Sequence, residues 1–181
     1  SQDLNNIILE TEDTPYIDTG VKGSNSRGID GGGPTDLNIL AQTFTMAAQK
    51  TLSKIRLYAF AGWYTDVDFS VNIHGGTPTA YGTSYGGGSG VVNRNTPVPY
   101  IDVTFDSPIT LPAGSYFFDI TTSLAKTGGN VTYPFNVYLS SAAYAGGSHY
   151  YFYGGHSGSW VNDTSNDIAF ILYEAGADTT V

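Results

Sequence analysis

The sequence contains no cysteine, so it can form neither disulfide bridges nor thiolate metal sites. It is also poor in charge, because Asp, Glu, Lys and Arg make up only 13% of the residues. Lys and Arg number seven in total, and the net charge is −9. Nucleic-acid phosphates and anionic lipid surfaces attract clustered cations. The seven Lys and Arg residues form no such cluster in the sequence, so we expect no nucleic-acid partner.

Long apolar runs are missing as well. No stretch approaches the roughly 20 apolar residues that a helix needs to cross a bilayer, and no signal-peptide pattern opens the chain. We therefore expect no membrane insertion. Glu, Lys, Ala and Leu, which helical proteins use heavily, do not dominate the composition, and no window shows a helical period.

In place of charged residues, the sequence is rich in glycine, tyrosine and β-branched residues, with 23 Gly and 14 Tyr. Aromatic and β-branched residues favour strands. The clearest alternation runs from Asp66 to Ile73, where apolar residues occupy every second position. This period of two predicts a strand with one face in a core and one in water. The apolar set is Val67, Phe69, Val71 and Ile73.

Similar signals recur along the chain between Gly- and Pro-rich turns and predict an all-β antiparallel β-sandwich, jelly-roll-like, with about eight or nine strands. Residues 1–40 are expected to form an irregular arm with a first strand near Ile7-Ile8-Leu9. Residues 41–175 are expected to form the sandwich domain, and residues 176–181 a tail. The Gly-, Tyr- and Pro-rich stretch 74–99 is predicted to be a long loop, flexible at residues 86–90.

Three stretches carry a resemblance to known modules. They are Gln42 to Tyr58, Phe105 to Tyr116 with its Leu111-Pro112-Ala113-Gly114 turn, and Tyr144 to Tyr173 with Gly158-Ser159-Trp160. Together they resemble β-sandwich modules of bacterial surface proteins and phage structural proteins, which look related to jelly-roll carbohydrate-binding modules. The resemblance covers roughly residues 41 to 173. It implies a non-catalytic role in display, adhesion or glycan contact, and it carries no fixed site residues.

The aromatic surplus supplies the candidate ligand-binding residues, for glycan or for a protein partner. Exposed rings stack on the apolar faces of sugars, and they also anchor protein interfaces. Tyr81 and Tyr85 are expected to be the most exposed, because glycine surrounds them. The alternative is packing against neighbouring strands, which we expect for Trp160. The candidates are Trp63, Tyr64, Tyr81, Tyr85, Tyr151 and Tyr153.

Calcium is the ion that the sequence suits best, as a structural ion. Its ligands are oxygens from Asp, Asn and backbone carbonyls in loops, and residues 162–167 offer Asp163 and Asp167 close together. Asp30 and Asp36 offer a second option. The alternative is that these residues only shape turns. A metal site of His149 and His156, which flank a predicted strand and its turn, is less favoured because no ligand motif is present.

Catalytic motifs are lacking. The sequence has no nucleophile elbow and no zinc-binding helix motif. The acid pairs Glu10 with Glu12 and Asp66 with Asp68 are two residues apart, so each pair shares one strand face. Glycoside hydrolysis needs two carboxylates that oppose each other across a cleft. We therefore predict a protein that is not an enzyme.

The leading functional hypothesis is a structural or adhesive component of a phage virion, such as a head-decoration or fibre protein, with glycan contact as an added role. Its partners would be copies of itself or capsid and tail proteins. The alternative is a carbohydrate-binding module of a secreted bacterial enzyme or adhesin, with a polysaccharide as partner. A small polysaccharide-degrading enzyme is the third hypothesis. The first two hypotheses place the protein on a virion surface or outside the cell.

Overall fold

The computed structural model describes residues 8–20, 22–31, 37–62, 65–94, 99–125, 133–141, 144–154, 159–176 and 178–180. In these ranges every helix or strand assigned is a strand, which confirms the all-β class, although the strands outnumber the eight or nine predicted. The strands are β1 (Ile8–Glu10), β2 (Thr14–Asp18), β3 (Lys22–Ile29), β4 (Leu37–Met46), β5 (Lys50–Leu57), β6 (Ala59–Ala61), β7 (Val67–Thr77), β8 (Ala80–Val92), β9 (Ile101–Leu111), β10 (Gly114–Thr121), β11 (Phe135–Ser140), β12 (His149–Tyr153), β13 (Ser159–Asp163), β14 (Phe170–Glu174) and β15 (Asp178–Thr180).

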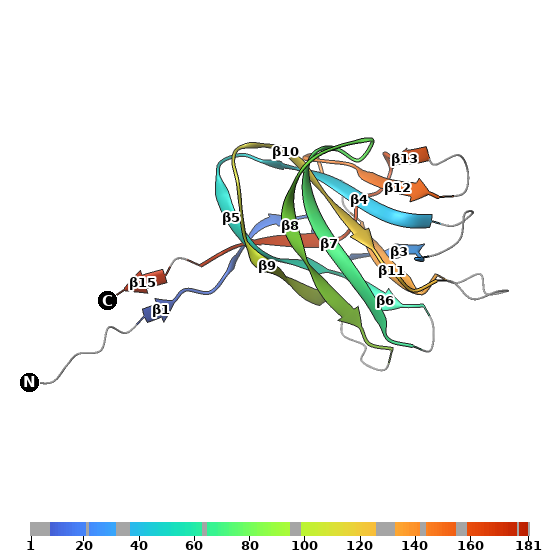
Figure 1. Ribbon diagram of the computed structural model, residues 1–181, viewed down its shortest axis with the longest axis horizontal. Coiled ribbons are helices and arrows are strands. Elements are labelled where there is room, and N and C mark those ends of the chain that lie inside the picture. Colours follow the sequence, from blue (N-terminus) through green and yellow to red (C-terminus); the bar gives the residue numbers. More distant parts are fainter. Residues whose placement is uncertain are drawn as a thin grey trace, which may run out of the picture.

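The strands form a sandwich of two layers (Figure 1). One layer is a six-stranded sheet in the order β13-β12-β4-β10-β7-β8. The other contains the four-stranded sheet β2-β14-β5-β9 and the three-stranded sheet β3-β11-β6. An antiparallel bridge between Leu139 and Ile168 joins these two sheets. β1 and β15 pair with each other outside the sandwich, and all the named strand pairs are antiparallel.

The core lies between the layers and is filled by large apolar side chains. The apolar face predicted for β7, from Val67 to Ile73, is buried. Phe118 of β10 meets Phe170 of β14 with ring centroids 4.9 Å apart. Phe69 of β7 meets Phe135 of β11 at 4.6 Å. Each such buried side chain stabilises the fold by roughly 1.5–3 kcal/mol, so these contacts hold the layers together.

The predicted loop over residues 74–99 is wrong for most of its length. β7 and β8 pair as a long hairpin, and the glycines 86–90 lie inside β8. A Cβ atom at Gly87 would overlap the carbonyl oxygen of Val71, and one at Gly88 would overlap that of Thr104 in β9. Glycine is therefore needed here because other backbones approach closely. The glycine-rich segment 86–90, which was predicted to be flexible, is therefore part of a packed strand.

The N-terminal segment also differs from the irregular arm that the sequence predicted. Residues 14–18 and 22–29 form β2 and β3, which pair with β14 and β11 in the second layer. Ile17 and Ile29 are buried there. In the described part of the chain, no helix has the length and apolar character required to cross a membrane.

Candidate functional site

The outward surface of the six-stranded sheet holds most of the candidate chemistry. Phe118 and Ile73 point into the core, so their neighbours in β10 and β7 point the other way. We call this surface the outer face. Three cross-strand pairs line its centre: Phe117 with His74, Asp119 with Asn72, and Thr121 with Ser70.

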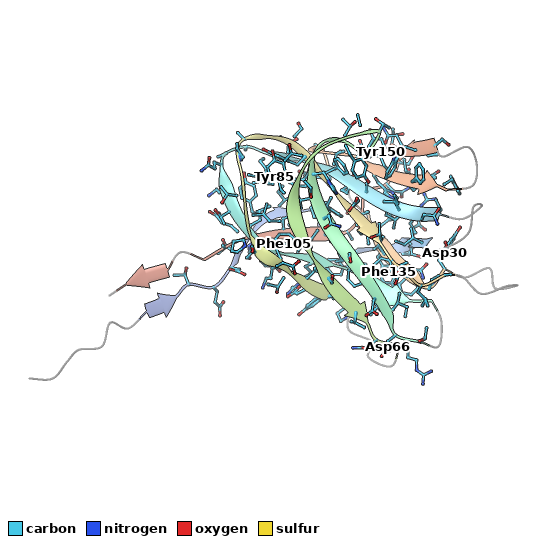
Figure 2. The ribbon with its side chains drawn as sticks, viewed as in Figure 1. Asp30, Asp66, Tyr85, Phe105, Phe135 and Tyr150 are labelled. Atoms are coloured by element: carbon cyan, nitrogen blue, oxygen red, sulfur yellow. The ribbon has the colours of Figure 1, made fainter. Side chains whose placement is uncertain are left out.

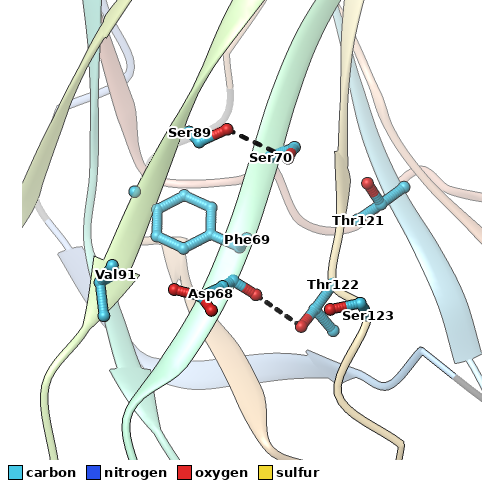
Figure 3. A pocket seen from close by; sticks show the side chains of 9 residues that line it. Asp68, Phe69, Ser70, Ser89, Val91, Thr121, Thr122 and Ser123 are labelled. Carbon is cyan, nitrogen blue, oxygen red and sulfur yellow. Dashed lines mark hydrogen bonds between the residues drawn. The ribbon is translucent and has the colours of Figure 1, made fainter.

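A groove of about 540 Å³ lies at one end of the outer face (Figure 3). Hydroxyl groups dominate its polar lining. Ser70 and Ser89 face each other at 3.3 Å, and the Thr122 hydroxyl donates to the Asp68 carbonyl oxygen at 2.7 Å. Val91, which is 46% exposed, adds an apolar contact. The lining residues are Asp68, Phe69, Ser70, Ser89, Gly90, Val91, Thr121, Thr122 and Ser123.

A group of rings also lies on the outer face, and we call it the ring cluster: His74, Tyr81, Phe117, Phe152 and Trp160. The Tyr81 ring lies 4.8 Å from both the His74 and Phe117 rings and 6.3 Å from Trp160. Trp160 in turn lies 5.2 Å from Phe152, its cross-strand partner. Tyr81 and Trp160 remain partly accessible to ligands, whereas Phe117 is covered.

Asp119 lies beneath the ring cluster and is 6% exposed. The Tyr81 hydroxyl donates to Asp119 Oδ2 at 3.0 Å, and His74 Nε2 lies 3.2 Å from the same oxygen. Burial, reinforced by the Asp119 charge, raises the pKa of Tyr81 well above its usual value, so its hydroxyl stays protonated. Asp119 Oδ1 and His74 Nε2 have no hydrogen-bond partner among the described residues.

The two tyrosines predicted to be exposed are so, but they belong to different surroundings. Tyr81 is 44% exposed and Tyr85 is 38% exposed. Tyr81 belongs to the ring cluster. Tyr85, which is labelled in Figure 2, packs edge-on against the buried Tyr116 with ring centroids 5.5 Å apart. Pairing of β7 with β8 shifts in register at this point and leaves Tyr85 between the partners Ser84 and Gly86. Only Tyr81 of this pair reaches the outer face.

The other ring candidates lie elsewhere. Tyr151 and Tyr153 pack against the hydrophobic core, and the Arg27 guanidinium lies 4.3 Å from the Tyr151 ring. The structure therefore does not bring them to the outer face. Trp63 and Tyr64 lie outside the described residues. Trp160 contacts the neighbouring strand as expected, yet it also belongs to the ring cluster.

The two calcium candidates are held by protein groups. Asp163 accepts hydrogen bonds from Arg27 and from the Ser165 backbone, and Asp167 accepts from Gln42 and the Tyr144 backbone. Such contacts fit the turn-shaping alternative. Among the described residues, no group of three or more His, Asp or Glu could hold a metal ion. Calcium stays a prediction, and of the second pair Asp30 is buried while Asp36 lies outside the described residues.

His149 is fully buried. Burial, together with the nearby charge of Arg27, lowers the pKa of His149 to about 4, against the opposite effect of Asp163. Its Nδ1 lies 3.9 Å from Asp163 Oδ2, and neither ring nitrogen has a hydrogen-bond partner among the described residues. His156, its predicted neighbour, lies outside those residues.

Several site residues were not singled out from the sequence. Continuing the alternation of Asp68, Ser70 and Asn72 by one step places His74 on the same face, so this residue could have been found. Asp119 gave no such signal, because the preceding run Tyr116-Phe117-Phe118 is apolar on both faces. The cover over Phe117 comes from Tyr81, which is distant in sequence.

No protein-family model matches the chain, and no curated protein matches it. Among solved structures it is similar to the cysteine protease and lectin-like domains of Cwp84, a surface layer associated protein of Clostridium difficile. The TM-score is 0.50 at 11% sequence identity. The match covers 86% of this chain and 37% of that chain, so this chain spans little more than a third of it. At this identity the likeness concerns the fold.

Proposed function

We propose that this chain is a non-catalytic carbohydrate-binding module that holds a glycan on the outer face of its six-stranded sheet. The observation that carries the proposal is the groove lined by hydroxyl groups on the same face as the ring cluster. The C–H faces of a sugar pack on aromatic rings, while its hydroxyls exchange hydrogen bonds with Ser, Thr and Asp. One face offers both kinds of contact.

The structural neighbour gives this proposal further support. That protein has a lectin-like domain and is associated with a surface layer. It favours the carbohydrate-binding hypothesis over the virion hypothesis, which remains a prediction from the sequence. A module of this kind would act outside the cell or on its surface, with a polysaccharide or a glycoprotein glycan as partner.

The groove suits binding better than hydrolysis. Its described lining contains one carboxylate, Asp68. Glycoside hydrolysis ordinarily uses two carboxyl groups about 5–10 Å apart on opposite sides of the scissile bond. The flanking hydroxyls of Ser70 and Ser89 can donate and accept hydrogen bonds, but nothing adjacent activates them as nucleophiles within the described lining. The module would retain its ligand unchanged.

A panel of polysaccharides and glycans, measured by isothermal titration calorimetry, tests the proposal. We expect at least one ligand to bind, and Asp68→Ala to weaken its binding roughly tenfold to a hundredfold, because a hydrogen bond to a charged group is lost. Glu12→Ala is the matched control, since Glu12 is an exposed acid just before β2 in the other layer. No binding across the panel, or equal binding by Asp68→Ala, would contradict the proposal.

A further inference from the structure

We infer that the bound glycan is an extended, uncharged polysaccharide chain, which lies across the strands of the six-stranded sheet from the groove to Phe152 and Trp160. This inference rests on the proposed function. It adds the direction of the chain on the outer face, the length of chain that the site holds and the residue that contacts the far end of that length.

The strand register places one row of side chains across the whole sheet, and we call it the cross-strand row. From β8 to β13, its residues are Ser89, Ser70, Thr121, Ile39, Phe152 and Trp160. Each is the cross-strand partner of the next, except that Thr121 and Ile39 lie one step beyond the paired residues Ile120 and Leu40. Neighbouring strands are about 4.8 Å apart, so the row is roughly 24 Å long.

The cross-strand row lies on the outer face and is accessible. Residues next to it along the strands point the other way: Leu40, beside Ile39, is in the core, and Tyr151, beside Phe152, packs against the core. Ser89 is exposed, and the other five residues of the row are half-buried. A ligand can therefore reach the row along its length.

The outer face is covered on one side of the row. Phe117 and Ala41 point outward from β10 and β4, yet both are fully buried. Tyr81, near the tip of the β7–β8 hairpin, contributes to this cover, because its ring lies 4.8 Å from the Phe117 ring and its hydroxyl donates to Asp119. A chain that left the groove along the strands toward Phe117 would meet this cover. The direction across the strands is the open one.

The two halves of the cross-strand row offer the two kinds of contact that a sugar chain uses. Ser89, Ser70 and Thr121 line the groove with hydroxyl groups, which exchange hydrogen bonds with sugar hydroxyls. Phe152 and Trp160 carry rings with centroids 5.2 Å apart, and the C–H faces of sugars pack on such rings. A chain along the row is hydrogen-bonded at one end and packed on rings at the other.

The row suits an interior stretch of an uncharged chain. It is longer than one or two sugar rings, and it ends on β8 and β13, the edge strands of the sheet, so a polysaccharide can continue past both edges. None of its six residues is ionisable, and Asp68 is the one ionisable residue among the described groove lining. Uronic acids and sulfated sugars would find no cation there and would be repelled by Asp68.

A chain-length series tests the inference. The probes are the di-, tetra- and hexasaccharides of glucose, mannose, galactose, xylose and N-acetylglucosamine, the corresponding long polymers and a polyuronate. For the sugar that binds, we expect the affinity to rise at least tenfold from the disaccharide to the hexasaccharide, because only the longer chain spans the row. Polyuronate binding is expected to be at least tenfold weaker than binding of the uncharged polymer.

Trp160→Ala tests the far end of the row. It is expected to weaken hexasaccharide binding about tenfold and to leave disaccharide binding in the groove unchanged, because the shorter ligand does not reach the ring. Tyr100→Ala is the matched control, since it removes a ring that is 38% exposed beside β9 in the other layer, and it is expected to change neither affinity. Circular dichroism checks that both variants fold.

A fluorescence measurement tests the same contact without a change in the row. The sequence contains two tryptophans, so Trp63→Phe leaves Trp160 as the one emitter of its kind. We expect the hexasaccharide to shift the emission of Trp160 and the disaccharide to leave it unchanged. This readout serves if Trp160→Ala does not fold.

Distinct results separate the two levels of the proposal. Equal affinity for the di- and hexasaccharide, equal effects of Trp160→Ala on both, an unchanged Trp160 emission in the hexasaccharide complex, or tight polyuronate binding would each overturn the cross-strand inference. Weaker binding by Asp68→Ala would then still support the proposed function. Failure of every probe to bind would overturn the proposed function itself.

Discussion

At the scale of single residues, burial decides how the ionisable side chains behave. His149 is the clearest case, because it is held neutral between Arg27 and Asp163 in the interior. The sequence alone placed it at a strand end, and only the pairing of β12 with both β4 and β13 shows that it is enclosed. The character of such a residue comes from distant strands, which local patterns do not reveal.

The low pKa of His149 predicts a loss of stability in mild acid. An unfolded His takes up its proton near pH 6.5, whereas folded His149 does so only near pH 4. Between these values the unfolded state binds more protons, so the free energy of unfolding falls as the pH falls. We expect a loss on the order of 3 kcal/mol from pH 7 to pH 4, since each pKa unit corresponds to ~1.4 kcal/mol.

Urea unfolding at a series of pH values measures this effect. His149→Leu, which keeps an apolar group of similar size in the interior, is expected to flatten the curve between pH 6.5 and pH 4. Parallel curves for the variant and the wild type would show that other groups cause the loss.

Core rings give a second prediction at this scale. Phe118 is fully buried and contacts both Phe44 of its own sheet and Phe170 of the other layer. Phe118→Ala is expected to lower the free energy of unfolding by about 3–5 kcal/mol, because it leaves a cavity between the layers. Chemical unfolding measures the change, and a loss below about 1 kcal/mol would mean that the interior refills the space.

At the scale of elements, strands with one buried and one solvent-exposed face could be predicted from the sequence. Strands rich in glycine or in polar residues could not. β7 follows the expected alternation from Val67 to Ile73. β8 contains five small residues in a row from Gly86 to Gly90, so no alternation marks it as a strand. β3 is mostly polar and was likewise missed. Both strands are stabilised by backbone pairing with neighbours, which leaves little trace in the sequence.

The glycines of β8 give a prediction for the hairpin. Gly88→Ala places a Cβ against the Thr104 carbonyl oxygen and is expected to lower the free energy of unfolding by about 1–3 kcal/mol through crowding between β8 and β9. Gly75→Ala is the control, because its Cβ would meet the Tyr85 ring at an ordinary 3.4 Å. Chemical unfolding compares the two variants. Equal effects would contradict the crowding explanation.

At the scale of the whole molecule, the fold class could be predicted and the site only in part. The alternation of apolar residues, the turn residues and the lack of helical periods were sufficient to predict an antiparallel sandwich from the sequence. Of the ring candidates, the structure brings Tyr81 to the outer face, because its hairpin folds back over the sheet. Asp119 and Phe117 join it from a strand that is distant in sequence. Sites built across several strands depend on register, which the sequence did not specify.

A nuclear magnetic resonance titration of the isolated chain with the soluble glycan that binds most tightly tests the central claim most directly. We expect the largest amide shifts at Ser70, Ser89 and Thr121 in the groove and at Tyr81 in the hairpin, with little change at Arg56 in the other layer. Shifts gathered around Arg56, or a saturated complex without shifts on the outer face, would contradict the account.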